Sequence, residues 1–247
     1  MRVVFERLRR LLGSAGVAPV VPQPPDSAAM QRTIADIRAA KLSYCGPPKL
    51  ENITEALLRV RSENVPGRYV EAGVALGGSA ILLGLLKPAD VPLDLFDVFA
   101  MIPPPGANDG EDAHRRYDEI RSGASAGLGG DTYYGYVDGL LDKVKSNLRH
   151  FGLDPEGGNI RLIPGLFEDT LYPPGPVALA HIDCDWYDSV RVCIERIVPH
   201  LAPGGIMIFD DYSSYSGCRR AVDEWLEHDT AMEKLFHRRS LGVRRGS

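Results

Sequence analysis

The sequence predicts a doubly wound α/β domain, with a mostly parallel sheet covered by helices on both faces. From residue 68 onward, short apolar runs alternate with segments of helical period, which is typical of βαβ units. A glycine-rich turn follows one apolar run and acidic residues follow others, as at the ligand-binding edge of such sheets. The 247 residues, 44% of them hydrophobic, are enough for one large layered core.

The elements are predicted in a regular order. Arginines among apolar residues indicate a short basic amphipathic helix over residues 1–16, which we expect to dock or dimerise; a membrane-surface helix is the alternative. The proline-rich residues 17–25 lead into a helix over 26–40, so residues 1–40 form a helical arm ahead of a domain spanning 41–247. Strands are predicted at 68–74, 93–96, 160–163, 177–182 and 205–209, and helices at 78–86, 136–151, 189–201 (N-capped by Asp188 or Ser189) and 217–228.

Two segments depart from this rhythm. Residues 103–135 contain three consecutive prolines and repeated glycines, which break any long element. A loop of this length is usually functional, so we predict a lid or substrate-recognition insertion, with simple disorder as the alternative. The basic residues 238–245 are interpreted as a tail, so a complete final β-hairpin is not expected.

Composition excludes several classes of function. The 28 lysines and arginines against 33 acidic residues give a net charge of -5, which disfavours nucleic acid as a partner. The four cysteines form no CxxC pair and the sequence opens with no signal-like segment, so we expect a cytoplasmic protein. The longest apolar stretch, 74–86, is glycine-interrupted and far shorter than the roughly 20 residues of a membrane span, so no membrane partner is expected.

The turn after the first predicted strand has the features of a cofactor cradle. Gly73 allows a tight turn, and Gly77 and Gly78 allow a ligand to approach the helix start closely. The spacing is not that of the dinucleotide motif. Asp97, at the end of the next strand, lies where such folds bind ribose, and the acidic Glu71 suits a sulfonium with an amino group, as in S-adenosylmethionine. An ordinary strand-to-helix connection is the alternative.

Four aspartates follow two later strands and form the stronger signal. Asp183 and Asp185 follow one strand, and Asp210 and Asp211 follow the next. If the strands are neighbours, Asp183, Asp210 and Asp211 converge, and such a cluster needs either raised pKa values or a hard divalent cation. We favour Mg²⁺, Mn²⁺ or Ca²⁺, since no paired His/Cys set at ligand spacing points to zinc; helix caps with solvated acids are the alternative.

Asp185 is the predicted general base. Two residues beyond Asp183, it would point to the same side of an extended backbone and take a proton from a hydroxyl held by the cation. His181 is a rival base, but its place inside an apolar run favours a buried, satisfied histidine. His114, in the insertion, is a second rival without positional support.

The chain resembles one family over about residues 41–226, and five motifs carry the resemblance. They are PGRYVEAGV (66–74) with GGS (77–79), FDVF (96–99), GLFEDTL (165–171), DCDWYDS (183–189), and GG (204–205) with DDY (210–212). The family is that of the macrocin O-methyltransferases (TylF type), metal- and S-adenosylmethionine-dependent sugar O-methyltransferases of antibiotic pathways. Residues 97–103 depart from it, because the chain has DVFAMIP where the family usually shows DSFEGLP.

The resemblance implies a fold of the class I S-adenosylmethionine-dependent methyltransferase type and a role for each matching residue. The implied cofactor contacts are Glu71, Gly73, Ser79 and Asp97, with Phe167 and Glu168 near the adenine and Tyr44 in a segment (41–44) that closes over the cofactor; Asp183, Asp210 and Asp211 hold the metal, and Asp185 is the base.

The predicted function is transfer of a methyl group from S-adenosylmethionine to a hydroxyl of a sugar or glycosylated natural product, by a homo-oligomer (a dimer or higher). Two alternatives stay open. A glycosyltransferase would use Asp183 and Asp185 as a DxD motif to hold a metal and a nucleotide sugar, and a non-catalytic relative would bind the cofactor without turnover.

Overall fold

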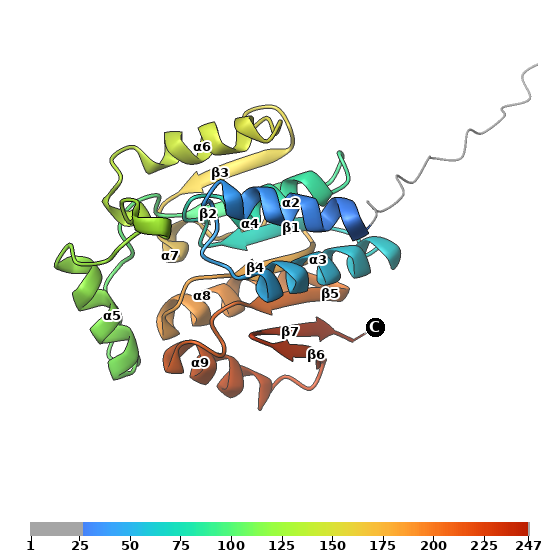
Figure 1. The fold of residues 1–247 in the computed structure, drawn as a ribbon. Coiled ribbons are helices and arrows are strands. Elements are labelled where there is room, and N and C mark those ends of the chain that lie inside the picture. Colours follow the sequence, from blue (N-terminus) through green and yellow to red (C-terminus); the bar gives the residue numbers. More distant parts are fainter. Residues whose placement is uncertain (1–26, 247) are drawn as a thin grey trace, which may run out of the picture.

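A seven-stranded sheet forms the centre of the domain in the computed structural model, which describes residues 27–246 (Figure 1). The predicted arm helix 1–16 and linker 17–25 lie outside the described residues. The strand order is β3-β2-β1-β4-β5-β7-β6, and β7 runs antiparallel to both of its neighbours, β5 and β6, so the predicted doubly wound, mostly parallel sheet is confirmed. The strands are β1 (Arg68–Ala72), β2 (Leu93–Asp97), β3 (Ile160–Pro164), β4 (Val177–Ile182), β5 (Leu201–Phe209), β6 (Met232–Arg238) and β7 (Ser240–Arg245).

Helices cover both faces of the sheet, and each face has its own apolar cluster. On one face lie α2 (Ser27–Ala39), α3 (Pro47–Ser62), α4 (Gly78–Leu86) and α6 (Leu140–His150); on the other lie α7 (Phe167–Thr170), α8 (Tyr187–Ile197) and α9 (Ser216–Leu226). We refer to these as the α3 face and the α8 face. Alternation along the strands explains the division, because Leu179 packs on the α3 face and Ala180 on the α8 face.

Strand register aligns the polar residues of the central strands. In the parallel pairing of β1 with β4, Glu71 lies opposite His181, and in that of β4 with β5, His181 lies opposite Ile208. Ile208 packs on the α3 face, so Glu71 and His181, in the same row, also point there. The carboxyl ends of β4 and β5 are therefore neighbours, as the aspartate pattern predicts.

Several predicted elements differ from the structure. The helix predicted at 189–201 begins at Tyr187, and its N-cap is Trp186 rather than Asp188 or Ser189. Residues 238–245 are not a tail: β6 and β7 form the final hairpin, with Leu241 and Val243 fully buried. The helix α3 was missed, although its apolar residues recur at helical spacing from Leu50 to Val60 and prolines occupy its first turn.

The insertion 103–135 is partly helical rather than a loop throughout. It contains α5 (Glu111–Arg121) and the short η1 (Leu128–Gly130), followed by η2 (Tyr134–Tyr136), and α5 stands beside the sheet at the lower left of Figure 1. Its acidic residues bind the starts of two helices on the α8 face. Asp109 Oδ1 accepts the Tyr187 backbone N–H at the start of α8 (2.7 Å), and Asp112 Oδ2 accepts that of Ser216 at the start of α9 (2.7 Å). These contacts anchor the insertion to the body of the domain.

The segment 41–44 crosses the start of α4. A Cβ atom at Gly78 would lie 2.5 Å from the carbonyl oxygen of Leu42 and from the Cβ of Ser43, so Gly78 makes room for the chain itself rather than for a ligand. The predicted reason for that glycine was therefore wrong. Within residues 27–246, no helix combines the length and the hydropathy that crossing a bilayer requires.

Candidate functional site

Two cavities adjoin at the carboxyl edge of the sheet. They share part of their walls, namely Gly73, Asp97, Tyr134, Asp183 and Asp185. The cavities have volumes of about 220 Å³ and about 240 Å³. Two ligands bound in these cavities would therefore meet beside the aspartates that follow β4.

The first cavity, which we call the turn cavity, lies over the β1 turn. Phe167, Leu166 and Glu168 line it together with the proline-containing start of the insertion. Gly73, at φ +91°, is required here, since a Cβ would lie 1.8 Å from the Asp183 carbonyl oxygen. Asp97 faces the cavity and holds the turn, because its carboxylate accepts the backbone N–H groups of Val74 (2.6 Å) and Phe99 (2.7 Å). Burial raises the pKa of Asp97, although these N–H groups act in the opposite direction.

The second cavity, which we call the acidic cavity, combines carboxylates with aromatic rings. Four tyrosines line it with Arg116, from the segments before α3, in the insertion and before α9. These are Tyr44, Tyr133, Tyr134 and Tyr215. Burial raises the pKa of Tyr133 to about 12, so its hydroxyl is protonated at neutral pH and can donate a hydrogen bond. The cavity therefore offers flat apolar surfaces with polar edges.

Asp183, Asp210 and Asp211 lie together at one end of the acidic cavity. Carboxylate oxygens of the three lie within 4.8 Å of one another. Asp210 Oδ1 and Asp211 Oδ2 are buried and have no hydrogen-bond partner among residues 27–246. Burial and the charges of Asp210 and Asp211 raise the pKa of Asp183 well above its usual range. A set of clustered oxygen ligands with unused acceptor capacity fits a hard divalent cation.

Lys49, in α3, reaches the same carboxylates. Its Nζ donates to Asp210 Oδ2 at 2.5 Å and lies 3.5 Å from Asp211 Oδ1. Burial would lower the pKa of Lys49, but the carboxylates of Asp210 and Asp211 outweigh it and raise that pKa above its usual range. The protein thus carries a positive charge of its own against the cluster.

His181 links Glu71 to Asp210 beneath the cluster. Its Nδ1 lies 2.9 Å from Glu71 Oε1 and its Nε2 lies 3.6 Å from Asp210 Oδ1; Glu71 and His181 are fully buried. Burial opposes the charged imidazole, but the two carboxylates outweigh it and raise the pKa of His181 to about 10. His181 is therefore buried, as the sequence favours, and it bears a positive charge at neutral pH. Its Nδ1 is hydrogen-bonded, whereas its Nε2 makes no hydrogen bond and faces Asp210 at an ion-pair distance.

Replacing His181 by leucine is expected to lower the free energy of unfolding by about 3–5 kcal/mol, because Glu71 and Asp210 would lose their buried cationic partner. The folded pKa of about 10 lies above the unfolded value of 6.5, so this stabilisation is fully present below pH 6.5 and is lost as the pH rises through 10. Urea denaturation in EDTA at pH 6.5 measures the difference. The exposed His114 on α5 provides the control, His114→Leu, and equal stability of the two variants would contradict the role of His181.

Asp185 occupies a left-handed backbone conformation between β4 and α8. Its φ is +60°, which aspartate tolerates better than most residues, so the backbone there is not extended as the sequence argument assumed. Asp185 nevertheless lines both cavities, as Asp183 does. Burial and the charge of Asp211 raise the pKa of Asp185 well above its usual range, so its carboxylate binds a proton more readily than a solvated one.

Other predicted site residues divide between the two cavities and the interior. Phe167 and Glu168 line the turn cavity, and Tyr44 lines the acidic cavity rather than the turn cavity. Glu71 and Ser79 are both buried, and neither residue lines either cavity. The Glu71 carboxylate faces His181 instead of a cavity, so this geometry does not place it in direct contact with a cofactor as predicted.

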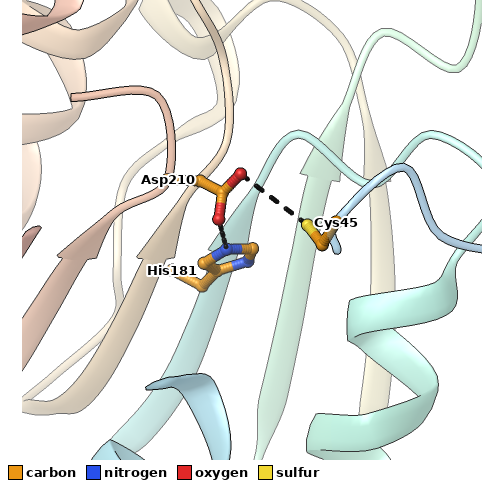
Figure 2. Close-up of side chains that lie close together, drawn as sticks. All are labelled: Cys45, His181 and Asp210. Carbon is orange, nitrogen blue, oxygen red and sulfur yellow. Dashed lines mark hydrogen bonds and ion pairs between the residues drawn. The ribbon is translucent and has the colours of Figure 1, made fainter. Parts of the chain in front are cut away.

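Sequence reasoning missed the residues that α3 and the insertion bring to the site. Lys49 and Cys45 lie at or just before the start of α3, and Cys45 Sγ is 3.7 Å from Asp210 Oδ2. Cys45, His181 and Asp210 place their ligand atoms within 4.8 Å of one another (Figure 2). The sequence shows no paired His/Cys set at metal-ligand spacing along the chain, but the fold brings this histidine and this cysteine together in space. The adjacent tyrosines at 133 and 134 could have indicated an aromatic binding surface in the insertion, but the predicted site residues did not include them.

Comparison with known proteins gives a consistent result. A family profile described as "Macrocin-O-methyltransferase (TylF)" matches residues 18–243. The chain is 32% identical over 186 residues to the 8-demethyl-8-(2,3-dimethoxy-alpha-L-rhamnosyl)-tetracenomycin-C 4'-O-methyltransferase of Streptomyces olivaceus. It is 33% identical over 187 residues to the demethyldecarbamoylnovobiocin O-methyltransferase of Streptomyces niveus. Each alignment covers 73% of this chain and 66%, just under two thirds, of the relative.

Solved structures share the fold. The O-methyltransferase NovP superimposes with a TM-score of 0.69 at 28% identity, over 83% of each chain. An O-methyltransferase from Bacillus cereus, solved in complex with SAH, has a TM-score of 0.55 over 90% of this chain, and at 14% identity it supports the fold alone.

Proposed function

Because the chain belongs to the macrocin-O-methyltransferase (TylF) family, we propose that it transfers a methyl group from S-adenosylmethionine to a hydroxyl of a sugar on a glycosylated natural product. The two Streptomyces relatives act, by their names, on a rhamnosyl tetracenomycin and on demethyldecarbamoylnovobiocin. The observation that carries the proposal is the shared wall of the two cavities, at which Asp183 and Asp185 face both.

The turn cavity fits S-adenosylmethionine. Its wall includes a glycine backbone free of Cβ, the buried carboxylate of Asp97 for ribose hydroxyls, and the ring of Phe167 beside Glu168 for an adenine. When bound, the cofactor supplies an electrophilic methyl group. Gly73 and Asp97 hold the turn in one shape, so the residues of this chain position the donor before an acceptor arrives.

The acidic cavity fits a sugar and a divalent cation. Asp183, Asp210 and Asp211 would hold the ion through oxygen ligands, with Mg²⁺, Mn²⁺ or Ca²⁺ as the matching class. Such an ion supplies Lewis acidity toward an acceptor hydroxyl. The tyrosine rings present apolar faces to the sugar carbons and hydroxyls to its oxygens, and they exclude water from the shared wall.

Asp185 accepts the proton from the acceptor hydroxyl at its carboxylate. Its place in the shared wall supports this role, because a general base must lie within reach of the proton that it accepts. His181 cannot compete for the role, because both of its ring nitrogens face buried carboxylates.

Titration calorimetry tests the proposal against a glycosyltransferase. S-adenosylmethionine is expected to bind in the turn cavity with one site per chain, and a nucleotide sugar such as UDP-glucose is not. A panel of glycosides incubated with methyl-deuterated S-adenosylmethionine and Mg²⁺ should then yield a product heavier by one deuterated methyl group. Binding of UDP-glucose in place of S-adenosylmethionine would reject the methyltransferase assignment, and binding of S-adenosylmethionine without transfer to any glycoside would favour a non-catalytic protein.

A further inference from the structure

Cys45, His181 and Asp210 form a second group of potential metal ligands beside the carboxylate cluster. Figure 2 shows the imidazole of His181 facing Asp210, with the Cys45 sulfur directed at the other oxygen of the same carboxylate. The distances are 3.6 Å from His181 Nε2 to Asp210 Oδ1 and 3.7 Å from Cys45 Sγ to Asp210 Oδ2. All three residues are buried.

The orientation of His181 matches that of a metal-binding histidine. Its Nδ1 is held by Glu71 Oε1 at 2.9 Å, which leaves Nε2 directed toward Asp210 and Cys45. Within residues 27–246, neither His181 Nε2 nor Asp210 Oδ1 has a hydrogen-bond partner. Buried polar atoms without partners are rare, and a carboxylate behind one imidazole nitrogen is the usual support for a metal on the other.

The spacing of the three residues agrees with the size of a zinc site. Zinc bonds of about 2.0–2.3 Å in a tetrahedron separate neighbouring ligand atoms by about 3.3–3.7 Å. The distances from Asp210 to His181 and to Cys45 are 3.6 and 3.7 Å, to different oxygens of the one carboxylate, and Asp183 Oδ2 borders the group at 3.6 Å from Cys45 Sγ. One ligand atom from each of the three residues lies within 4.8 Å of the others, so the side chains would close in slightly around an ion.

We propose that Cys45, His181 and Asp210 form a site for a thiophilic divalent cation such as Zn²⁺, next to the all-carboxylate site and sharing Asp210 with it. A thiolate and an imidazole favour Zn²⁺ over Mg²⁺, which prefers oxygen ligands. On binding, the Cys45 thiol and the Nε2–H of the His181 imidazolium each release a proton to solvent. A thiolate and a neutral imidazole, which keeps its Nδ1–H on Glu71, then coordinate the ion. Because Asp210 serves both sites, Zn²⁺ here removes a ligand from the carboxylate site and inhibits the proposed methyl transfer.

Cobalt and zinc binding to the full-length, metal-stripped chain test this site. Co²⁺ is expected to produce the near-ultraviolet charge-transfer absorption of a cobalt-bound thiolate. Cys45→Ala should abolish this band and weaken Zn²⁺ binding by about 100-fold or more, as measured by competition with a chromophoric chelator. The matched control is Cys193→Ala, a fully buried cysteine on α8, which should keep both. Mn²⁺ binding to the carboxylate site should be unchanged in Cys45→Ala.

Two results would overturn the site: a cobalt spectrum of the unmodified chain without a thiolate band, or a Cys45→Ala variant that retains its Zn²⁺ affinity. The first result needs no variant, so it decides the matter even if Cys45→Ala fails to fold. The measurements use neither S-adenosylmethionine nor an acceptor. A failed methyl-transfer assay with an intact cobalt spectrum therefore rejects the proposed function alone, and the converse rejects only the thiophilic site.

Discussion

Replacing Asp185 by asparagine is expected to lower kcat for methyl transfer by about 100- to 10,000-fold, the usual contribution of a general base. Asparagine keeps the size of the side chain and tolerates the left-handed backbone at this position, but it cannot accept the acceptor's proton. The dissociation constant for S-adenosylmethionine should stay unchanged, since the turn cavity retains Asp97 and Phe167. Single-turnover kinetics and titration calorimetry measure the two quantities separately.

Asp118→Asn is the matched control for Asp185→Asn. Asp118 lies on α5, where its carboxylate pairs with Arg121 on the surface, so the same chemical change should leave kcat unaltered. Full activity of Asp185→Asn would refute its role as the base. A loss of S-adenosylmethionine binding equal to the loss of kcat would instead make Asp185 a residue that shapes the shared wall.

Asp211→Asn is expected to weaken Mn²⁺ binding by more than about 100-fold and to remove the dependence of activity on added metal. The loss of a residue that merely hydrogen-bonds a metal ligand typically lowers metal affinity by about 10- to 100-fold, and the loss of a ligand itself should cost more. Asp211 is the informative choice among the three acids. Asp210 also contacts His181 and Lys49 closely, whereas Asp211 reaches Lys49 at only 3.5 Å, so replacing Asp211 leaves the ion pairs of Asp210 in place.

Electron paramagnetic resonance of Mn²⁺ gives the affinity directly, with Asp131→Asn as the control. Asp131 is exposed and pairs with Lys41, and it lies outside the carboxylate cluster. Removal of metal from the unmodified protein by EDTA should reproduce the activity of Asp211→Asn. A variant that binds Mn²⁺ as tightly as the unmodified chain would show that the ion, if bound, is held elsewhere.

The sequence predicts that the aspartates converge because their convergence depends only on each aspartate following an apolar strand along the chain. Asp183 and Asp210 each follow an apolar strand, and adjacent parallel strands place their carboxyl ends at one edge. Lys49 and Cys45 could not be found in this way. They reach Asp210 from positions 161 and 165 residues away, through the packing of α3 on the sheet, which no periodic pattern encodes.

In two of the segments that the sequence misjudged, α5 and the final hairpin, the apolar pattern is sparse or is hidden by charged residues. In α5 only Ala113 and Ile120 are buried, and the helix is supported by surface pairs such as that of Arg116 with Glu119, so proline and glycine dominated the prediction. In the final hairpin the arginines obscured an alternating strand. Arg244 pairs with Glu63, while Leu241 and Val243 fill the apolar cluster of the α8 face.

The contacts of Asp109 and Asp112 have a consequence for engineering the acceptor range. Each carboxylate caps a helix of the body, at the starts of α8 and α9, and such caps are typically worth about 1 kcal/mol each. A chimaera that exchanges the whole of residues 103–135 for a relative's segment would uncap both helices, one of which begins two residues after Asp185. Grafts confined to residues 123–135 alter the tyrosine wall and leave both caps in place.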